Sequence, residues 1–259
     1  GVMSYAKDVA LAVLLVLVFC LLTAIRGEAM KVLVACEHTG EVRRAFAARG
    51  HEAWSCDLLP ATDNHNMHLQ GDVRDVLGMG WDFIMVAHPP CTRLCNSGVR
   101  WLDEPPGKLS AEHYTVDEIA EYAMMTRDER LAFMWRKLDE GAALFSDLWN
   151  APIPMKCIEN PIMHKHAKAR ITNYRDFAQS VQPWHFGDPE TKRTCFWLDG
   201  LEPLKPVFNT WDACREVLGL PKGAKPVDRV HKAPPGPERW KERSKFFPGM
   251  AAAMAAQWG

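Results

Sequence analysis

A cysteine stands directly after two prolines at the end of a short apolar run, residues 83–87. The run has the length of a buried parallel strand, and Pro89 and Pro90 end it because neither can donate to a sheet ladder. In an open α/β sheet, ligands bind at the carboxyl ends of the strands. A thiolate fixed in such a turn is a candidate nucleophile, which is the functional interpretation of Cys91. The alternative is a buried packing residue, the usual place of a free cysteine.

A carboxylate ends a second apolar strand pattern at Glu159, which is followed by Asn160 and Pro161. The carboxyl ends of two parallel strands lie at the same edge of a sheet. Glu159 and Cys91 each follow the end of a strand, so we expect them to lie near each other. A carboxyl group at such a strand end is a candidate general acid or base, and the alternative is a solvated surface carboxylate.

The chain from Met30 onward follows a strand, turn, helix, strand pattern. Residues 31–36 predict a buried strand and residues 41–49 a helix, with Gly40 able to take a positive φ in the turn between them. A second strand at 52–56 ends in Asp57, 17 positions after Gly40. An acid about 20 positions after such a glycine binds ribose hydroxyls in dinucleotide-binding folds. This predicts one half of a doubly wound sheet.

The chain after the second strand contains one more candidate acid, a long helix pattern and a basic segment. Asp72 lies in a short link before residue 83, where a plain surface turn is the alternative to a ligand contact. Residues 131–148 form an amphipathic crossover helix, and a strand over 189–197 carries Lys192 and Arg193. The basic, Trp-containing part of the chain after Thr191 predicts either a nucleic-acid backbone contact or an ordinary solvated surface.

The composition excludes several classes of protein. The chain has 259 residues, 47% of them hydrophobic, and a formal net charge of -1, which excludes wholesale disorder and gives no overall basic signal. Its eight cysteines contain no Cys-x-x-Cys pair, which disfavours a zinc ribbon, and a chain with this much core does not need disulfides. We therefore expect reduced thiols, no metal, a cytoplasmic protein and a monomer.

Residues 1–29 differ in composition from the remainder. A run of 17 uncharged residues, 9–25, stands at the lower limit for crossing a bilayer. Membrane anchoring through 9–25, a signal peptide and a non-native start before Met30 are the three interpretations. In each of them the functional domain comprises residues 30–259.

Pro-Pro-Cys91, then Glu159-Asn-Pro, then Thr191-Lys-Arg193 form an ordered set that resembles the DNA cytosine-C5 methyltransferases, in particular the compact forms of phages and prophages. The resemblance covers residues 30–259. It implies a Rossmann-like methyltransferase fold with a doubly wound, mostly parallel sheet. It also implies transfer of a methyl group from S-adenosylmethionine to carbon 5 of cytosine in DNA.

The resemblance assigns roles to individual residues. Cys91 would attack the base, Glu159 would hold its ring, and Arg193 would contact the base. The cofactor would be bound by residues at the ends of the first strands, namely Cys36, Glu37, His38, Gly40, Asp57, Asp72 and Pro89. His38 stands where the family has a glycine, and only 50 positions separate Arg193 from residue 243. The target-recognition region is therefore reduced, and sequence specificity is either low or supplied by residues 93–130.

Three other interpretations remain beside this one. An amino-group DNA methyltransferase would have an acid or Asn before the two prolines, where His88 stands. A catalytically impaired, nucleic-acid-binding protein of methyltransferase fold is favoured by the altered glycine turn. A zinc site of His88, Cys91 and Cys95 lacks a second pair of ligands at a usual spacing.

Overall fold

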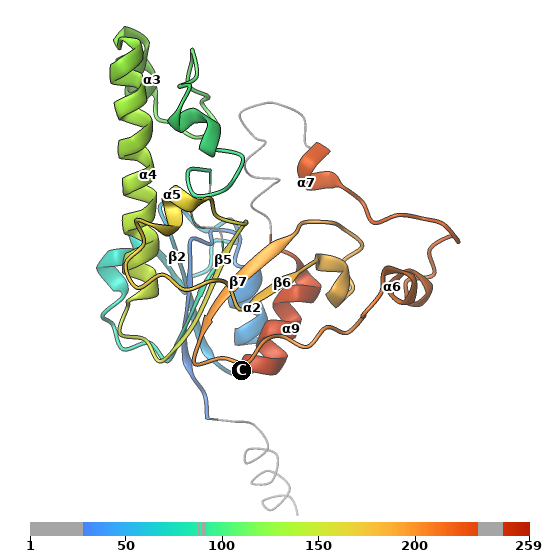
Figure 1. Ribbon diagram of the computed structural model, residues 1–259. Coiled ribbons are helices and arrows are strands. Elements are labelled where there is room, and N and C mark those ends of the chain that lie inside the picture. Colours follow the sequence, from blue (N-terminus) through green and yellow to red (C-terminus); the bar gives the residue numbers. More distant parts are fainter. Residues whose placement is uncertain (1–27, 88, 90–91, 233–245) are drawn as a thin grey trace, which may run out of the picture.

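The structure is a computed structural model, and it describes residues 28–87, 89, 92–232 and 246–259 (Figure 1). Its centre is one sheet in which seven strands follow the order β3-β2-β1-β4-β5-β7-β6. The strands are β1 (Lys31–Ala35), β2 (Glu52–Asp57), β3 (His68–Gln70), β4 (Phe83–Val86), β5 (Met155–Asn160), β6 (Gln179–Val181) and β7 (Thr194–Asp199).

The strand directions confirm the predicted fold class. The pairs β1–β2, β1–β4, β2–β3 and β4–β5 are parallel, whereas β7 runs antiparallel to both β5 and β6. This is the doubly wound order 3-2-1-4-5-6 with a reversed strand inserted between the fifth and the sixth. The fold is thus the Rossmann-like methyltransferase fold with a mostly parallel sheet.

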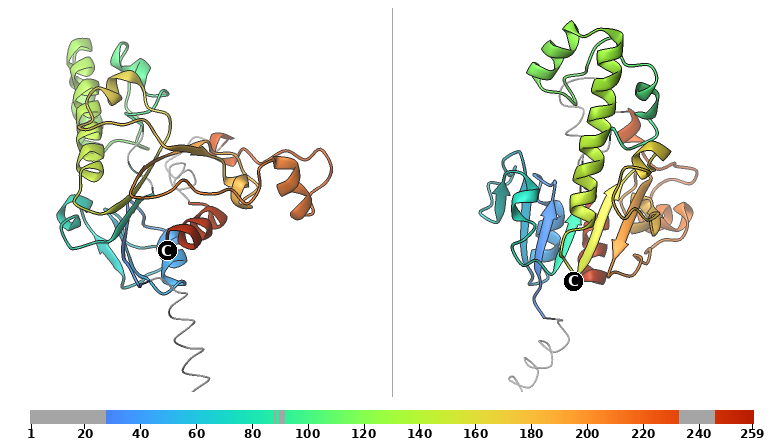
Figure 2. Two further views of the ribbon diagram at one scale, coloured as in Figure 1. Left: turned by 60° about the horizontal axis from the view of Figure 1, so that its bottom comes forward. Right: turned by 60° about the vertical axis from the view of Figure 1, so that its left-hand side comes forward.

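Helices cover both faces of the sheet, as Figure 2 shows. Helices α2 (Glu41–Ala47) and α9 (Pro248–Trp258) pack on one face, where Phe46 and Phe83 stack with ring centroids 5.3 Å apart. Helix α4 (Arg127–Trp149) packs on the other. Burial on both faces explains why the central strands read as continuous apolar runs.

The carboxyl edge of the sheet carries an additional lobe. Helix α4 is 23 residues long, and its first turns extend beyond this edge beside α3 (Val116–Met124) and the 3-10 helix η2 (Val99–Leu102) (Figures 1 and 2). Capping boxes start both helices, because Thr115 and Thr126 each exchange hydrogen bonds with a glutamate three positions on. We call residues 92–126 the lobe.

Four further short helices complete the described elements: η1 (Val73–Val76), α5 (Lys165–Lys168), η3 (Pro183–Phe186) and α6 (Trp211–Val217), followed by the single turn α7 (Arg229–Lys232). Helix α6 lies in the basic part of the chain after Thr191. Strand β7 begins at Thr194, so the prediction that Lys192 and Arg193 lie on this strand is wrong. Both residues precede it, because Pro189 and the hydrogen bond between Thr191 and Val227 tie this segment to a loop instead.

The apolar leader lies outside the described residues, apart from positions 28 and 29. Within the described part of the chain, no helix is both long and apolar enough to cross a bilayer.

Candidate active site

Cys91 and Pro90 lie outside the described residues, but the structure describes Pro89 before them and the chain from Thr92 onward. Strands β4 and β5 pair in parallel with Val86 opposite Ile158, so the residues that follow, Ala87 and Glu159, stand at the same level of the carboxyl edge. Pro89 is buried there. The prediction that two strand ends deliver the Pro-Pro turn and Glu159 to one edge therefore agrees with the register.

The segments that follow these two strand ends are bonded to each other. The amide of His164 donates to the Leu94 carbonyl at 3.0 Å, and the amide of Asn96 donates to the Ile162 carbonyl at 3.3 Å. The His164 ring adds a hydrogen bond from Nε2 to the Arg93 carbonyl at 2.8 Å while its Nδ1 accepts from the Ala167 amide. Burial lowers the pKa of His164, which favours the neutral ring that this pattern requires. The chain after Cys91 is thus fixed beside the chain after Glu159.

Glu159 is 4% exposed, and burial raises the pKa of its carboxyl group, opposed by the charge of Lys192 and by hydrogen bonds from Lys192 and Thr194. The Lys192 ammonium stands 3.6 Å from Oε1 of Glu159. Because β7 is antiparallel to β5, the residues before β7 lie at the edge where β5 ends, and this brings Lys192 to Glu159. The result is a buried carboxyl group that can exist in its protonated form, held by one cation.

Sequence reasoning selected Arg193 for this region and passed over Lys192. The Arg193 side chain is exposed, and its Nε donates to Oγ of Ser180 on the neighbouring strand β6 at 3.1 Å. Lys192 therefore meets Glu159, whereas Arg193 contacts β6. Their adjacency in sequence gave no means of deciding which one meets Glu159.

The turn between β1 and α2 holds the predicted cofactor residues Cys36, Glu37, His38 and Gly40. The Glu37 carboxylate is fully buried and accepts from the amides of Val42 and Arg43 at 2.7 and 3.2 Å. It therefore occupies the amino terminus of α2, a place where other folds bind phosphate. Burial outweighs these hydrogen bonds and raises the pKa of Glu37 to about 7.

Gly40 fits this turn for two reasons. Its φ of 72° lies in the left-handed region, and a Cβ there would collide with the guanidinium of Arg43. Arg43 is buried and forms an ion pair with Asp63 of the loop after β2. This buried pair was not predicted, because arginine and aspartate 20 positions apart leave no local pattern.

Asp57 and Asp72, the other predicted cofactor acids, come together with Cys36. Burial first, then the charges of Asp57, Cys56 and Asp72, raises the pKa of the Cys36 thiol. Asp57 accepts from the Leu59 amide at 2.9 Å. Asp72 forms an ion pair with Arg74, which lowers the pKa of Asp72. The ends of β1, β2 and β3 thus form one acidic group of side chains.

A hollow of about 650 Å3 adjoins the β1–α2 turn. His38 and Thr39 line one side, and Asp188, Phe246 and Phe247 line another. Asp188 accepts from the amides of Gly249 and Met250 at 3.1 Å each and so anchors the start of α9 at this hollow. Within the described residues, Oγ1 of Thr39 is buried without a hydrogen-bond partner.

A second hollow, of about 770 Å3, lies between the lobe and the segment before β7. Thr92, Pro161 and Lys192 all line it, so it reaches the segments that follow Cys91 and Glu159. Cys95 also borders it, but this thiol is buried and contacts Oγ of Ser97 at 3.0 Å and the Thr92 carbonyl.

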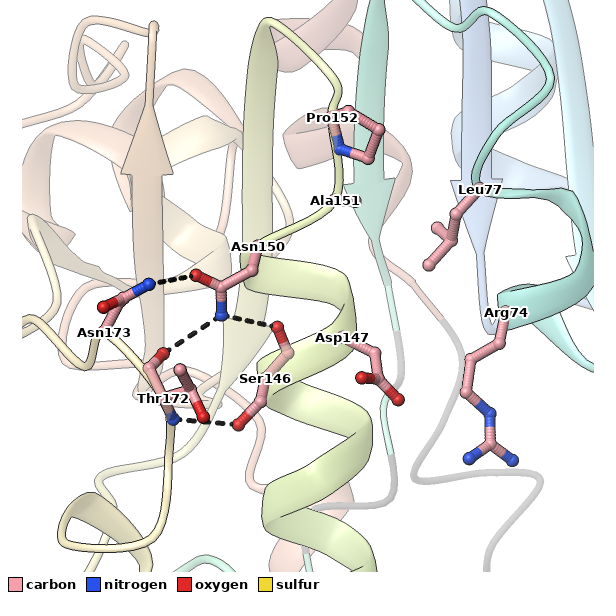
Figure 3. Close-up of a pocket in the computed structure, with 9 residues that line it drawn as sticks. All are labelled: Arg74, Leu77, Ser146, Asp147, Asn150, Ala151, Pro152, Thr172 and Asn173. Atoms are coloured by element: carbon pink, nitrogen blue, oxygen red, sulfur yellow. Dashed lines mark hydrogen bonds between the residues drawn. The ribbon is translucent and has the colours of Figure 1, made fainter.

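A third hollow, of about 670 Å3, lies at the carboxyl end of α4 (Figure 3). Asn150 links Asn173 and Thr172 across it through hydrogen bonds of 2.7 and 3.1 Å. None of the predicted site residues lines it. Among the residues that the structure describes, no group of three or more His, Cys, Asp or Glu side chains could hold a metal ion.

No family model matches the chain, and no curated protein matches it. Among solved structures, the chain is similar to a prophage-encoded E. coli protein assigned as a DNA modification methyltransferase, with 16% sequence identity and a TM-score of 0.37. The match covers 80% of this chain and 56% of the other, so the chain spans a little over half the length of that protein.

Proposed function

We propose that the protein is an S-adenosylmethionine-dependent DNA methyltransferase that modifies carbon 5 of cytosine through a covalent adduct with Cys91. The observation that supports this proposal is the buried Glu159, which has a raised pKa and Lys192 beside it and which ends β5, the strand that pairs in parallel with β4. The fold and the acidic group at the ends of β1, β2 and β3 supply a place for the cofactor.

The residues of the β1–α2 turn fit S-adenosylmethionine. Glu37 already accepts from the free amides at the start of α2, so a nucleotide phosphate would meet a carboxylate there. S-adenosylmethionine carries no phosphate, so it does not need these amides. Asp57 and Asp72 would accept from the ribose and the adenine, and Pro89 would border the reacting end. The cofactor would supply an electrophilic methyl group.

In the proposed reaction, the Cys91 thiolate adds to carbon 6 of a cytosine that has left the DNA stack. Glu159 donates a proton to N3 as this bond forms, which neutralises the charge that would otherwise develop on the ring. Lys192 is proposed to hold the Glu159 carboxyl group in place. Carbon 5 then takes up the methyl group and loses its proton, and Cys91 leaves from carbon 6 as N3 returns its proton.

The test traps the covalent adduct. In DNA that contains 5-fluorocytosine, carbon 5 cannot lose its fluorine, so the nucleophile stays attached after methyl transfer. The wild type and Cys95→Ser should both give a denaturant-resistant protein–DNA species that requires S-adenosylmethionine. Cys91→Ser should give none, because a serine hydroxyl is barely ionised at neutral pH. Glu159→Gln should bind the cofactor but form the adduct much more slowly.

The matched cysteine pair makes the result decisive. An adduct that persists in Cys91→Ser and disappears in Cys95→Ser would overturn the assignment of the nucleophile. Methyl transfer to DNA without any adduct would instead favour an amino-group methyltransferase. Cofactor binding without any transfer would favour the catalytically impaired protein.

A further inference from the structure

The lobe is a rigid structure built on α4. Tyr122 is 1% exposed, packs against Phe133 with ring centroids 5.2 Å apart, and donates its hydroxyl to the Pro106 carbonyl at 2.7 Å. Arg130 on α4 donates to the carbonyls of Tyr122, Ala123 and Gly107, each at 3.2 Å. These contacts fix the irregular part of the lobe to the helix, so its outward side chains keep a defined arrangement relative to the sheet.

The lobe pocket, the hollow of about 770 Å3 described above, has a strongly basic lining. Arg100 and Lys108 come from the lobe, and Lys192 and Arg193 come from the segment before β7. The lining contains one carboxylate, Glu112. Lys192 stands beside Glu159, which leaves Arg100, Lys108 and Arg193 against Glu112 among the described lining residues. This is an excess of positive charge that the chain as a whole, with a net charge of -1, does not have.

Aromatic rings support the cations on the lobe side. The guanidinium of Arg100 lies 4.1 Å from the ring centroid of Trp101, and that of Arg93 lies 4.8 Å from the ring centroid of Tyr114. Trp101 and Tyr114 both line the pocket. A guanidinium that lies on an aromatic ring has fewer accessible side-chain conformations. The contact with Trp101 therefore keeps the Arg100 side chain at the pocket.

The two sides of the lobe carry opposite charges. Asp117 and Glu121 on α3 are exposed. Among the described residues, none from α3 lines the lobe pocket. A polyanion that approaches the lobe is therefore attracted to the pocket side and repelled from the α3 side, so the charge pattern gives the bound molecule one orientation.

We propose that the pocket side of the lobe binds the DNA backbone on the strand that carries the target base. The proposal rests on the proposed function for the identity of the substrate. Arg100 and Lys108 neutralise phosphates on one side of the pocket. The pocket continues to Thr92 and Pro161, so a backbone held there delivers a base toward Glu159.

The experiment compares two pairs of cations. Arg100→Gln with Lys108→Gln removes two charges from the lobe, and the matched control, Arg49→Gln with Arg175→Gln, removes two exposed charges that lie after α2 and before β6, outside the pocket. Binding of a fluorescent DNA duplex is followed by anisotropy over a series of salt concentrations, without methyl transfer. The lobe pair should lower the slope of log K against log salt by about 2, since each phosphate contact contributes about 0.9. The control pair should keep the wild-type slope.

Two further measurements keep the outcomes separate. S-adenosylmethionine affinity by calorimetry and the thermal unfolding midpoint should match the wild type in the lobe pair, which excludes misfolding as the cause. A wild-type slope in the lobe pair, or an equal loss in the control pair, would overturn the proposal. So would an RNA duplex of the same length that competes as well as the DNA. Failure of adduct formation with normal, lobe-dependent DNA binding would instead refute only the proposed reaction.

Discussion

Replacing the buried carboxylate at the start of α2 should change how stability depends on pH. Glu37 has a pKa of about 7 in the folded chain against an ordinary value of 4.5. The folded state therefore binds the proton more tightly than the unfolded state. Its contribution to stability is complete below pH 4.5 and is lost as the pH rises through about 7. At 1.36 kcal/mol per unit of pKa, the loss is about 3 kcal/mol.

The assay is urea unfolding of the wild type and Glu37→Gln at several values between pH 4.5 and pH 8, which bracket the two values of the pKa. Glutamine does not titrate, so this part of the pH dependence should disappear in the variant. Because glutamine has only one acceptor oxygen for the amides of Val42 and Arg43, the variant should be less stable at low pH by about 1–3 kcal/mol. Because the wild type loses about 3 kcal/mol over this range, the two curves should meet or cross as the pH rises.

A matched variant identifies the group responsible. Glu41→Gln changes another carboxylate in the first turn of α2 but leaves Glu37 in place, so it should keep the wild-type slope. If the difference in unfolding free energy between the wild type and Glu37→Gln is the same at both ends of the range, Glu37 is ionised throughout and the reasoning from its burial is wrong.

Two further predictions concern the same edge of the sheet. Asp57→Ala and Asp72→Ala should each weaken S-adenosylmethionine binding, measured by calorimetry, by roughly five- to a hundredfold, because each removes a hydrogen-bond acceptor worth about 1–3 kcal/mol. Unchanged affinity would remove the corresponding acid from the cofactor site. Gly40→Ala should destabilise the fold by more than Gly50→Ala in thermal unfolding. Both glycines have positive φ, a cost of about 1–2 kcal/mol for alanine, but only at Gly40 would the added Cβ also meet a neighbouring side chain. Equal losses at the two positions would contradict the close approach.

The central part of the fold could be predicted because its signals are local. Strands β1, β2, β4 and β5 are apolar runs that end in turn residues, and α4 has a helical apolar period. Strands β3 and β6 were missed, since each has three residues and neither is fully buried along its length. Such strands are defined by the neighbour that they pair with, and the sequence does not show that neighbour.

In the candidate site, too, some positions could be predicted from the sequence and others could not. That Glu159 lies at the edge shared with the Pro-Pro turn follows from strand order, and the grouping of Cys36 with Asp57 and Asp72 follows from the βαβ pattern. Which cation meets Glu159 depends on where an antiparallel strand begins, and this was decided by a loop contact at Thr191. The catalytic roles of Cys91, Glu159 and Arg193, the roles of the cofactor residues and the membrane anchor remain predictions.

The packing of α2 against α9 has a consequence for the order of folding. Phe46 and Met250 belong to one apolar cluster although they stand more than 200 positions apart in the chain. Contacts at such separation form slowly, because a long loop must close before they are made. Until α9 docks, the face of the sheet around Phe83 remains open to solvent as an apolar surface. We therefore expect a partly folded form with exposed apolar surface, and we expect dilute refolding conditions to favour native folding over association with other copies.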